Sequence, residues 1–305
     1  MPKVSIVVPA YNAQNFIIET LKSLSAQTFE DFEIIVINDG SSDKTDKLVL
    51  NYSRKDPRVK LFSQINKGPA AARNVGFKKA KGGYVIWADA DDLWEKERLK
   101  ILVNFLDKNK NYDLVTSDAY IWYPQKKEKS KRYYTVFKVP EKLDFGHLLL
   151  GNFIFTSTLM RRKIIENNLM DEDRAIMGTE DYEFWLRVIH AGNKLKIINK
   201  PLVWYRQIGS SLSAQTEKIP QTLLFVFGKI EKKLKLTLGQ KKIINGRKNQ
   251  LYYILGKIYL DKKNFKKAMS FFKKGTDSRN KLAIVLMKSP NFFFWLSSLK
   301  KNLKK

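Results

Sequence analysis

The sequence predicts an α/β protein in which a doubly wound, mostly parallel sheet is followed by an all-helical region. Short apolar runs rich in β-branched residues alternate with segments of helical spacing through the first two-thirds of the chain. The runs are continuously apolar, which is typical of strands that helices cover on both faces. After Pro220 the alternation stops and only helical patterns remain. Because alternating strands and helices favour a parallel sheet, the first region determines the fold class.

Each predicted element is bounded by turn residues or by a change of period. The predicted strands are residues 4–9, 32–37, 59–63, 84–88, 112–122 and 201–206. Helical spacing is found at residues 15–26, 44–53, 143–150, and from residue 69 onward after a glycine-led loop. The first strand is expected to end at Pro9, and the lysine-rich residues 124–132 are expected to form a mobile loop or a solvated hairpin tip.

Length and composition indicate a globular protein of one large or two modest domains. The chain has 305 residues, a net charge of +27 and no cysteine, which excludes a disulfide framework and a thiolate metal site. No signal peptide is expected before the first strand, and no stretch of this sequence reaches the ~18 apolar residues needed to span a bilayer. These features are expected of a cytoplasmic protein.

The basic excess is concentrated in the last third of the chain. Residues 206–305 contain 24 Lys and Arg residues against 4 Asp and Glu residues. Such a surface favours nucleic acid, anionic lipid or an anionic substrate as a partner. The alternative is that the lysines only solvate the helix surfaces.

Three carboxylates, Asp89, Asp91 and Asp92, directly follow the fourth predicted strand. In open α/β sheets, ligands bind at the carboxyl ends of the strands, where these acids are expected. Asp89 and Asp91 are two residues apart, so extended backbone projects both carboxylates to the same side. Because like charges repel, this pair favours a divalent cation, Mn²⁺ or Mg²⁺, between the carboxylates and a substrate diphosphate. The alternative is a polar turn in which Asp92 caps a helix that starts near Glu95.

Other predicted strands deliver different polar groups to the same edge of the sheet. Tyr11 follows the first strand, Asp39 follows the second, and Arg73 lies after the third. A tyrosine offers a stacking face for a base, a carboxylate can accept from a ring N–H, and an arginine can pair with phosphate. The sequence contains neither G-x-G-x-x-G after the first strand nor a P-loop pattern. The set therefore predicts a nucleotide-diphosphate pocket with a metal.

Four motifs in this region resemble, in the same order, those of the family-2 glycosyltransferases of the GT-A fold. They are Val-Ser-Ile-Val-Val-Pro-Ala-Tyr-Asn at 4–12, Asn-Asp-Gly-Ser-Ser-Asp at 38–43, Gly-Pro-Ala-Ala-Ala-Arg-Asn-Val-Gly at 68–76 and Asp-Ala-Asp-Asp at 89–92. The resemblance extends from residue 4 to about residue 213. It implies inverting transfer of a sugar from a nucleotide-diphosphate donor, most often a uridine one (UDP), in a bacterial enzyme of the surface-polysaccharide or lipooligosaccharide type.

The resemblance also implies roles for single residues. The donor-binding residues that it implies are Pro9, Tyr11, Asp39, Arg73, Asp89, Arg206 and Ser211. Within this set Tyr11 and Asp39 are expected to hold the base, and Arg206 and Ser211 to contact the diphosphate. Asp91 is expected to bind the metal, with Asp89 reaching both the ribose and the metal.

A second acidic group, Glu180 and Asp181, follows Thr179 at the start of a predicted aromatic helix. Thr179 is the expected N-cap, and acids in a first helical turn complement the helix dipole without needing a chemical role. The resemblance implies instead that Asp181 is the general base that takes the proton of the acceptor hydroxyl. Glu180 and Trp185 are then expected on the acceptor side.

Histidine is not expected to take part in the chemistry. This chain has Ile208 where relatives often carry a histidine that is a candidate metal ligand, so that ligand is missing here. His147 and His190 fall on apolar helical faces and are expected to be structural.

The chain is expected to divide into a GT-A domain at residues 1–213 and a basic helical region at 214–305. Residues 1–92 would form the nucleotide-binding half of the first domain, and residues 93–213 the acceptor half. The helical region contains the spacing of one tetratricopeptide-like hairpin, at Tyr252, Leu255, Gly256, Tyr259, Ala268 and Phe272, with Asn264 in the turn. Aromatics beside lysines in residues 292–305 are typical of an anchor in anionic lipid; the alternative is a docked terminal helix.

Together these features predict a metal-dependent, inverting glycosyltransferase, peripheral on the inner face of a bacterial cytoplasmic membrane. Its acceptor would be a glycolipid or polysaccharide unit, as in lipopolysaccharide or capsule biosynthesis, and no nucleic-acid partner is expected. The sequence has no spanning segment and no Gln-x-x-Arg-Trp motif, which favours addition of a single sugar. The alternatives are a nucleotidyltransferase on a similar sheet and a basic nucleic-acid-binding or scaffold protein, which would leave the carboxylates unexplained.

Overall fold

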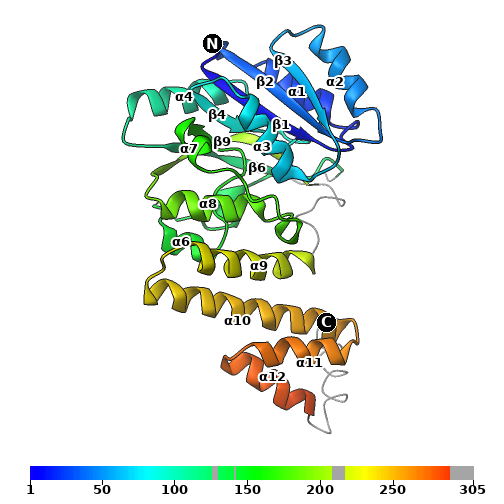
Figure 1. The fold of residues 1–305 in the computed structure, drawn as a ribbon, viewed down its shortest axis with the longest axis vertical. Helices are drawn as coiled ribbons and strands as arrows, with labels where there is room; N and C mark the ends of the chain where they lie inside the picture. Colours follow the sequence, from blue (N-terminus) through cyan, green and yellow to red (C-terminus); the bar gives the residue numbers. More distant parts are fainter. Residues whose placement is uncertain (126–129, 141, 208–216, 289–305) are drawn as a thin grey trace. The chain divides into compact units, whose positions relative to one another are not determined.

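The computed structural model describes residues 1–125, 130–140, 142–207 and 217–288 (Figure 1). The chain divides into two compact units, Met1–Ala214 and Gln215–Lys305. The first unit contains a mixed sheet with helices, and the described part of the second is helical. The predicted α/β fold with a helical C-terminal region is confirmed. Ile208, Ser211 and the aromatic and lysine-rich residues 292–305 lie outside the described residues.

The first half of the sheet is parallel and consists of apolar strands. These strands are β1 (Val4–Ala10), β2 (Phe32–Asp39), β3 (Val59–Gln64) and β4 (Tyr84–Trp87), in the spatial order β3-β2-β1-β4. Ile6 and Val8 of β1 belong to a buried core that includes Leu21 of the following helix. Val7 points to the opposite face and is also completely buried. Both faces of β1 are therefore covered, which explains its continuous apolar run.

Four helices connect and cover these strands. They are α1 (Ile17–Ser25), α2 (Thr45–Ser53), α3 (Pro69–Lys79) and α4 (Arg98–Lys108). Helix α3 approaches β1 so closely that a Cβ on Gly76 would lie 2.2 Å from Cγ1 of Val7. Glycine at this position therefore allows α3 to pack directly on the sheet and to begin at its carboxyl edge.

The second half of the sheet mixes parallel and antiparallel pairs. Its strands are β5 (Leu93–Trp94), β6 (Leu114–Trp122), β7 (Lys131–Arg132), β8 (Leu159–Arg161) and β9 (Leu195–Arg206). Strand β8 lies between β4 and β6 and is antiparallel to both, whereas β6 and β9 are parallel. The short helices of this half are α5 (Tyr133–Val136), α6 (Phe145–Leu150), α7 (Lys163–Asn167), the 3₁₀ helix η1 (Arg174–Ile176) and α8 (Glu180–His190).

The turn after β4 differs from the prediction. Strand β5 follows it directly and pairs antiparallel with β9. Helix α4 therefore begins at Arg98 and not near Glu95. Since Asp92 precedes a strand, the expectation that it caps a helix is wrong.

The helical unit contains α9 (Lys218–Lys233), α10 (Leu238–Asp261), α11 (Phe265–Lys274) and α12 (Ser278–Lys288). Helices α10 and α11 pack as a hairpin, and a Cβ on Gly256 would lie 2.3 Å from the ring of Phe272. Asn264 caps α11 by accepting from the Lys267 N–H at 3.1 Å. The Tyr253 ring of α10 packs against the Phe272 ring, with centroids 5.8 Å apart.

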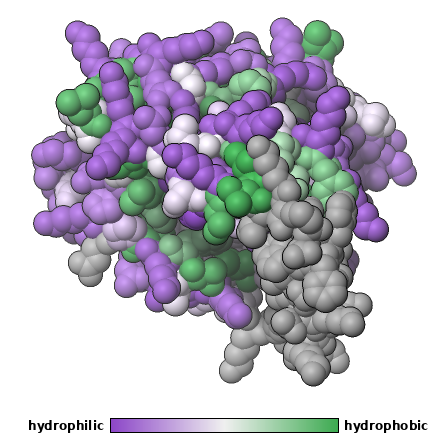
Figure 2. All heavy atoms as spheres, turned by 90° about the horizontal axis from the view of Figure 1, so that it is seen from below, coloured by the Kyte–Doolittle hydropathy of each residue, from purple (hydrophilic) through white to green (hydrophobic). Residues whose placement is uncertain are grey.

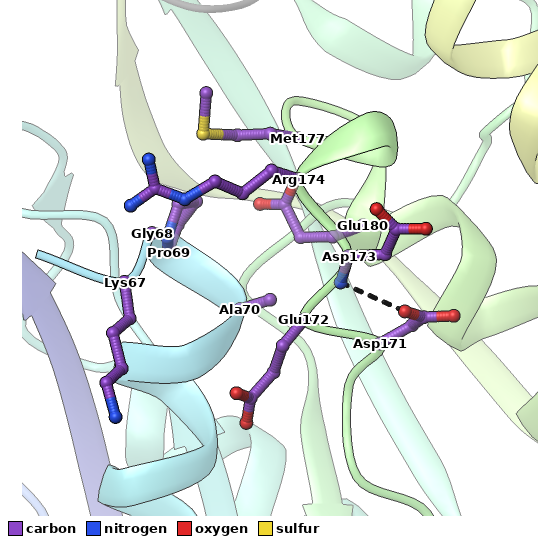
Figure 3. Close-up of a pocket in the computed structure, with 10 residues that line it drawn as sticks. All are labelled: Lys67, Gly68, Pro69, Ala70, Asp171, Glu172, Asp173, Arg174, Met177 and Glu180. Carbon is purple, nitrogen blue, oxygen red and sulfur yellow. Dashed lines mark hydrogen bonds between the residues drawn. The ribbon is translucent and has the colours of Figure 1, made fainter.

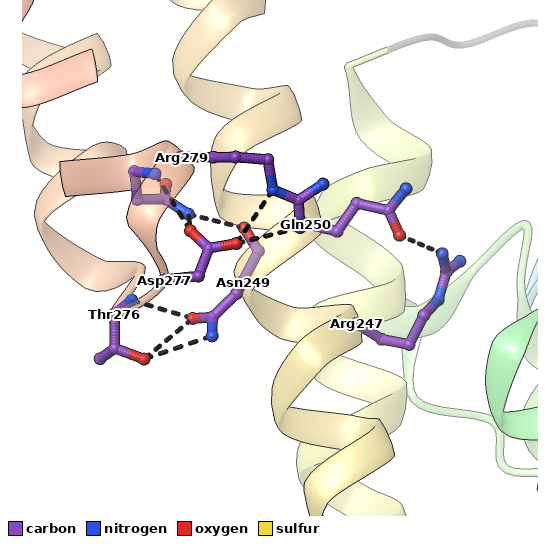
Figure 4. Close-up of polar contacts among 7 residues, drawn as sticks. Arg247, Asn249, Gln250, Thr276, Asp277 and Arg279 are labelled. Carbon is purple, nitrogen blue, oxygen red and sulfur yellow. Dashed lines mark hydrogen bonds and ion pairs between the residues drawn. The ribbon is translucent and has the colours of Figure 1, made fainter. Parts of the chain in front are cut away.

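Polar side chains tie the start of α12 back to α10 (Figure 4). The Thr276 N–H donates to Asn249 Oδ1 at 3.0 Å, and Asn280 Nδ2 donates to the Asn249 carbonyl at 3.0 Å. Asn280 is completely buried, and Asp277 beside it pairs with Arg279 at 3.0 Å. Helix α12 thus adds a third layer to a hairpin that cannot bury its own apolar face.

Hydrophilic side chains dominate the face drawn in Figure 2, and hydrophobic side chains lie between them. The large apolar side chains that the helical unit exposes include Phe225, Leu238, Leu282 and Val285. Across the ranges that the structure describes, no helix is both long enough and apolar enough to pass through a bilayer.

Candidate active site

The loop after β1 is hydrogen-bonded to the loop after β2 at the carboxyl edge of the sheet. Asn12 Oδ1 accepts from the Ser42 N–H at 2.9 Å, and the Asn12 N–H donates to Ser41 Oγ at 3.0 Å. Tyr11 beside it is 55% exposed. An exposed aromatic ring at this edge suits the predicted stacking on a base.

Pro9 lies inside β1, which continues to Ala10, so the expected strand end at Pro9 is wrong. The pairing of β1 with β4 stops at Val7, whose carbonyl accepts from the Ala88 N–H at 2.9 Å. Alternate residues of a strand share a hydrogen-bonding side, so the missing N–H of Pro9 points past the end of the β4 ladder. Proline is therefore tolerated here without loss of a ladder bond.

Asp39, at the end of β2, accepts three hydrogen bonds from the segment that leads into α3. Gln64 Nε2 and the Lys67 N–H donate to Oδ1 at 2.7 and 2.9 Å, and the Gly68 N–H donates to Oδ2 at 2.8 Å. Gly68 has a φ of +94°, a left-handed conformation that favours glycine. Asp39 thus fixes the loop before α3, and its contact with a base stays a prediction.

Arg73, on α3, joins the two acidic groups of the site. Its Nη1 donates to Glu180 Oε1 at 2.7 Å and its Nη2 donates to Asp89 Oδ1 at 3.0 Å. Burial alone would lower the pKa of Arg73, but the charges of the nearby carboxylates, Asp89 first, outweigh it and raise the pKa. The guanidinium also lies over Trp87, 5.5 Å from the ring centroid. Arg73 therefore stays charged and holds the end of β4 against the start of α8.

The three carboxylates after β4 have different surroundings. Asp89 accepts from Arg73 and, at Oδ2, from Thr156 Oγ1 at 3.0 Å. No side chain of the described ranges donates to Asp91, and burial together with the charge of Asp89 raises the pKa of Asp91 to about 6. Asp92 is buried and accepts from the Arg206 N–H at 3.0 Å. Burial, followed by its acidic neighbours, raises the pKa of Asp92 well above its usual value.

Asp89 and Asp91 are the candidates for binding a divalent metal. Within the part of the chain that the structure describes, no cluster of three or more His, Cys, Asp or Glu side chains could hold one. The two carboxylates offer hard oxygen ligands, and Arg206 offsets the charge of Asp91 less than burial and Asp89 oppose it. This pair fits Mn²⁺ or Mg²⁺ when phosphate oxygens of a substrate and waters complete the coordination.

Glu180 and Asp181 open α8, and their carboxylates are held differently. Glu180 accepts from Arg73 and, at Oε2, from the Gly178 N–H at 2.6 Å. Asp181 Oδ2 accepts from Asn152 Nδ2 at 3.1 Å. Burial, and then the charge of Glu180, raises the pKa of Asp181 to about 6, while Arg73 acts in the opposite direction. A carboxylate with this pKa can accept a proton near neutral pH.

The start of α8 agrees with the prediction only in part. Thr179 is at the N-cap position, as predicted, but its hydroxyl donates to the Ile176 carbonyl at 2.9 Å and makes no capping hydrogen bond. Trp185 is 0% exposed and stacks on Trp87, with ring centroids 5.0 Å apart and planes at 16°. Trp185 therefore supports the site from the core and does not contact an acceptor.

Arg206, at the end of β9, holds the turn after β4. Its Nε donates to the Asp91 carbonyl at 2.7 Å, and its Nη2 donates to Glu19 Oε2 at 2.7 Å. The guanidinium lies over Trp122, 4.3 Å from the ring centroid. Arg206 thus positions the backbone of the candidate metal ligand, and its contact with a diphosphate stays a prediction.

A small hollow lies beside the start of α3 (Figure 3). Its walls come from residues 67–70 and 171–174, with Met177 and Glu180. Arg174 joins the two walls by donating to the carbonyl and to Oδ1 of Asn66, at 2.9 and 3.0 Å. The Glu180 carboxylate that pairs with Arg73 therefore also borders this hollow.

The segment between α6 and β8 was not predicted to take part in the site. It supplies Asn152 to Asp181 and Thr156 to Asp89. Its sequence, Asn-Phe-Ile-Phe-Thr-Ser-Thr at 152–158, shows hydroxyl and amide side chains within an otherwise apolar run. Polar side chains within a buried run need hydrogen-bond partners, so this pattern could have indicated that the segment contacts the site.

The two histidines contact residues at α6. The His190 ring packs against Phe145, with centroids 4.8 Å apart. His147 Nδ1 lies 2.7 Å from Asp144 Oδ1, at the start of the same helix. Their structural role stays a prediction.

A sheet edge with exposed and charged side chains, next to a half-buried carboxylate that can act as a base, is typical of an enzyme of the nucleotide-dependent transferase class. Residues 5–169 match the family described as glycosyl transferase family 2. The match spans more than half of the chain, which therefore belongs to this family.

Two relatives agree with this assignment. The chain is 33% identical over 222 residues to the uncharacterized glycosyltransferase EpsJ of Bacillus subtilis, covering 70% of this chain but only 63% of EpsJ. It is 28% identical over 238 residues to the putative teichuronic acid biosynthesis glycosyltransferase TuaG of Bacillus subtilis, covering 76% of this chain and 89% of TuaG.

Two solved structures have the same fold. S. aureus TarS 1-349 in complex with UDP gives a TM-score of 0.64 at 19% identity, covering 98% of this chain and 92% of TarS 1-349. The mannosyltransferase PcManGT from Pyrobaculum calidifontis, in complex with GDP-Man and Mn²⁺, gives a TM-score of 0.64 at 19% identity, covering 97% and 83% of the two chains. At this identity the likeness shows the fold alone.

Proposed function

We propose that this glycosyltransferase moves one sugar from a nucleotide-diphosphate donor, a UDP-sugar, to a hydroxyl of a glycan or glycolipid acceptor, with inversion. The observation that carries the proposal is the connection between two carboxylates. Asp181, half-buried and with a pKa of about 6, is next in sequence to Glu180, which Arg73 joins to Asp89 on the donor side. A proton acceptor therefore lies one residue from a carboxylate that is ion-paired with the donor-binding edge.

Asp181 is the general base in this proposal. It takes the proton of the acceptor hydroxyl while that oxygen attacks the anomeric carbon of the donor sugar. The attack comes from the face opposite the diphosphate, so the bond to the diphosphate oxygen breaks with its electron pair and the configuration inverts. The transition state is oxocarbenium-like, as in glycosidic cleavage generally. Arg73 keeps the ends of β4 and α8 together during this step.

Asp91, with Asp89, would hold Mn²⁺ or Mg²⁺. Such an ion, when bound, neutralises charge on the leaving diphosphate. The Asp91 carboxylate accepts from no side chain of the described ranges, and this supports the role. The Mn²⁺ in PcManGT, a protein of the same fold, supports it as well.

The acceptor that we propose is a surface polysaccharide or its lipid-linked precursor, made at the cytoplasmic face of the membrane. The name of TuaG supports a polysaccharide product. The helical region supports an anionic surface as partner, because residues 217–288 contain nineteen Lys and Arg residues against four Asp and Glu residues. In this proposal residues 1–213 carry the chemistry and residues 214–305 carry the contact with the membrane.

A screen of nucleotide sugars tests the proposed reaction. We expect UDP to raise the melting temperature of the protein in the presence of Mn²⁺, and one UDP-sugar to be hydrolysed slowly without an acceptor. The same measurements with other nucleoside diphosphates establish which base is preferred. If no nucleoside diphosphate shifts the melting temperature, with or without metal, the proposed donor class is wrong.

Flotation with liposomes tests the proposed membrane contact. We expect the full chain to float with anionic vesicles and not with neutral ones, because lysine-rich segments bind anionic lipid. Deletion of residues 290–305 should release it, while nucleotide-dependent thermal shifts remain. Unchanged flotation after the deletion would exclude that segment as the anchor.

A further inference from the structure

One segment, between α6 and β8, contacts both acidic groups of the site. Thr156 Oγ1 donates to Asp89 Oδ2 at 3.0 Å, and Asn152 Nδ2 donates to Asp181 Oδ2 at 3.1 Å. The two donors are four residues apart in the sequence. The segment therefore fixes the position of the base relative to the donor-side carboxylate.

The segment is anchored in the core next to Thr156. Ser157 is 1% exposed, and its hydroxyl donates to the Trp87 carbonyl at 2.8 Å and accepts from Arg98 Nη1 at 2.9 Å. Trp87 is the last residue of β4, two positions before Asp89. Because the same strand end holds both Ser157 and Asp89, Thr156 has little freedom to move relative to Asp89.

The Asn152 amide is satisfied on one side only. Its Nδ2 faces the Asp181 carboxylate, since a carboxylate oxygen can only accept from it. Its Oδ1 is buried and has no hydrogen-bond partner among the described residues. A buried acceptor without a donor is unfavourable. A hydroxyl group of a bound substrate would satisfy it.

We propose that Asn152 is the positioning residue for the base: it orients the Asp181 carboxylate toward the acceptor hydroxyl, and its Oδ1 accepts from a substrate hydroxyl. Thr156 has the corresponding role for Asp89 on the donor side. This inference rests on the proposed glycosyl transfer and assigns the two ends of one segment to the two substrates. Substitutions at the two ends of the segment should therefore change different kinetic parameters.

Three other ionisable groups act on Asp181. They are Glu180 on the same helix, Arg73 on α3 and Tyr133 on α5. None of them is altered by changing Asn152. The hydrogen bond from Asn152 favours the ionised carboxylate, so its removal should move the titration of Asp181 to higher pH.

Steady-state kinetics of the full chain with Mn²⁺ separate the two ends. Asn152→Ala should lower kcat about tenfold, leave the KM of the donor unchanged, and move the acidic limb of the kcat/KM profile to higher pH. Thr156→Val should instead raise the KM of the donor about tenfold and leave the limb in place. Asn193→Ala is the matched control, because this amide donates to the Val188 carbonyl at 2.8 Å, near the other end of α8.

An NMR titration of aspartate carboxyl carbons tests Asn152 without turnover. The Asp181 signal is identified by its loss in Asp181→Asn, and we expect its midpoint to rise in Asn152→Ala and to stay in Asn193→Ala. Asn152→Leu has a similar side-chain size and removes the donor without adding a charge, so it should raise the midpoint as well and replaces the alanine variant if that variant folds poorly. An unchanged midpoint in both Asn152 variants overturns the positioning role, even in an active enzyme. A wild-type protein that transfers no sugar overturns the proposed function, and the titration still decides whether Asn152 orients Asp181.

Discussion

The acids at the end of β4 and the acids at the start of α8 are partly or fully buried, but they are compensated very differently. At the end of β4, Asp89 is paired with Arg73, while Asp91 forms no ion pair with a described side chain and Arg206 offsets its charge only in part. At the start of α8, Glu180 is paired with Arg73 and the helix N-terminus favours negative charge. The first group thus keeps charge in excess for a cation to neutralise, and the second holds one carboxylate ready to accept a proton.

One arginine serves both groups, which explains why they can lie so close together. Arg73 is 7% exposed on its side chain and forms one ion pair on each side. Arg73 carries one positive charge and its two partners, Asp89 and Glu180, carry two negative charges when ionised. The three side chains together therefore have a net charge of −1. The comparison therefore predicts that neutralising an acid has opposite effects in the two groups.

The largest expected effect is on catalysis, at the start of α8. Asp181→Asn should lower kcat about 10³-fold, because the amide cannot accept the acceptor proton. Donor binding, measured by the thermal shift with UDP and Mn²⁺, should remain. Asp46→Asn, an exposed acid on α2, is the control and should leave kcat unchanged. Full activity of Asp181→Asn would remove Asp181 from the role of base.

The next effect is on stability, in the compensated group. Glu180→Gln should lower the free energy of unfolding by about 3 kcal/mol, because Arg73 loses one partner of a buried ion pair. Urea denaturation measures this change. Glu166→Gln removes an exposed ion pair with Arg162 and should change stability by about 0.5 kcal/mol or less. Equal effects of the two substitutions would contradict the distinction between the groups.

At the end of β4 we expect the opposite change in the free energy of unfolding. Without metal, Asp91→Asn should raise the free energy of unfolding by about 1 kcal/mol, because it removes the repulsion between Asp91 and Asp89. The same variant should lose the additional thermal stabilisation that Mn²⁺ gives together with UDP. Differential scanning fluorimetry with and without metal separates the two effects. A destabilised metal-free variant would show that Asp91 is compensated by another group.

Much of this arrangement could be predicted from the sequence, because strand ends and helix starts are local features. The positions of Tyr11, Asp39 and Arg73 at one edge follow from the alternation of strands and helices. Hydrophobic periodicity gives the face of an element but not its partner. Trp185 could therefore be placed on α8, but not in the stack with Trp87 that buries it.

Contacts between segments that are distant in the chain could not be predicted from the sequence. Asp92 was expected to cap a helix because acids before a helical pattern do so, but β9 pairs with the following residues and its Arg206 N–H donates to Asp92. Asn152 and Thr156 carry no charge and lie in an irregular segment, so no periodic pattern indicates their partners. Their contribution depends on the packing of β8 between β4 and β6.

The smallest expected effect is a change with pH, and it distinguishes the two groups in the intact enzyme. Since the pKa of Asp181 is about 6, kcat/KM should fall to half its plateau near pH 6 and then tenfold for each further pH unit. The loss is on the acidic side because only the ionised carboxylate can accept the proton. The profile is measured at saturating Mn²⁺, which keeps the metal-binding carboxylates ionised. The acid limb then reports the base alone, and a half-maximum below pH 5 would mean that the start of α8 compensates Asp181 as fully as Glu180.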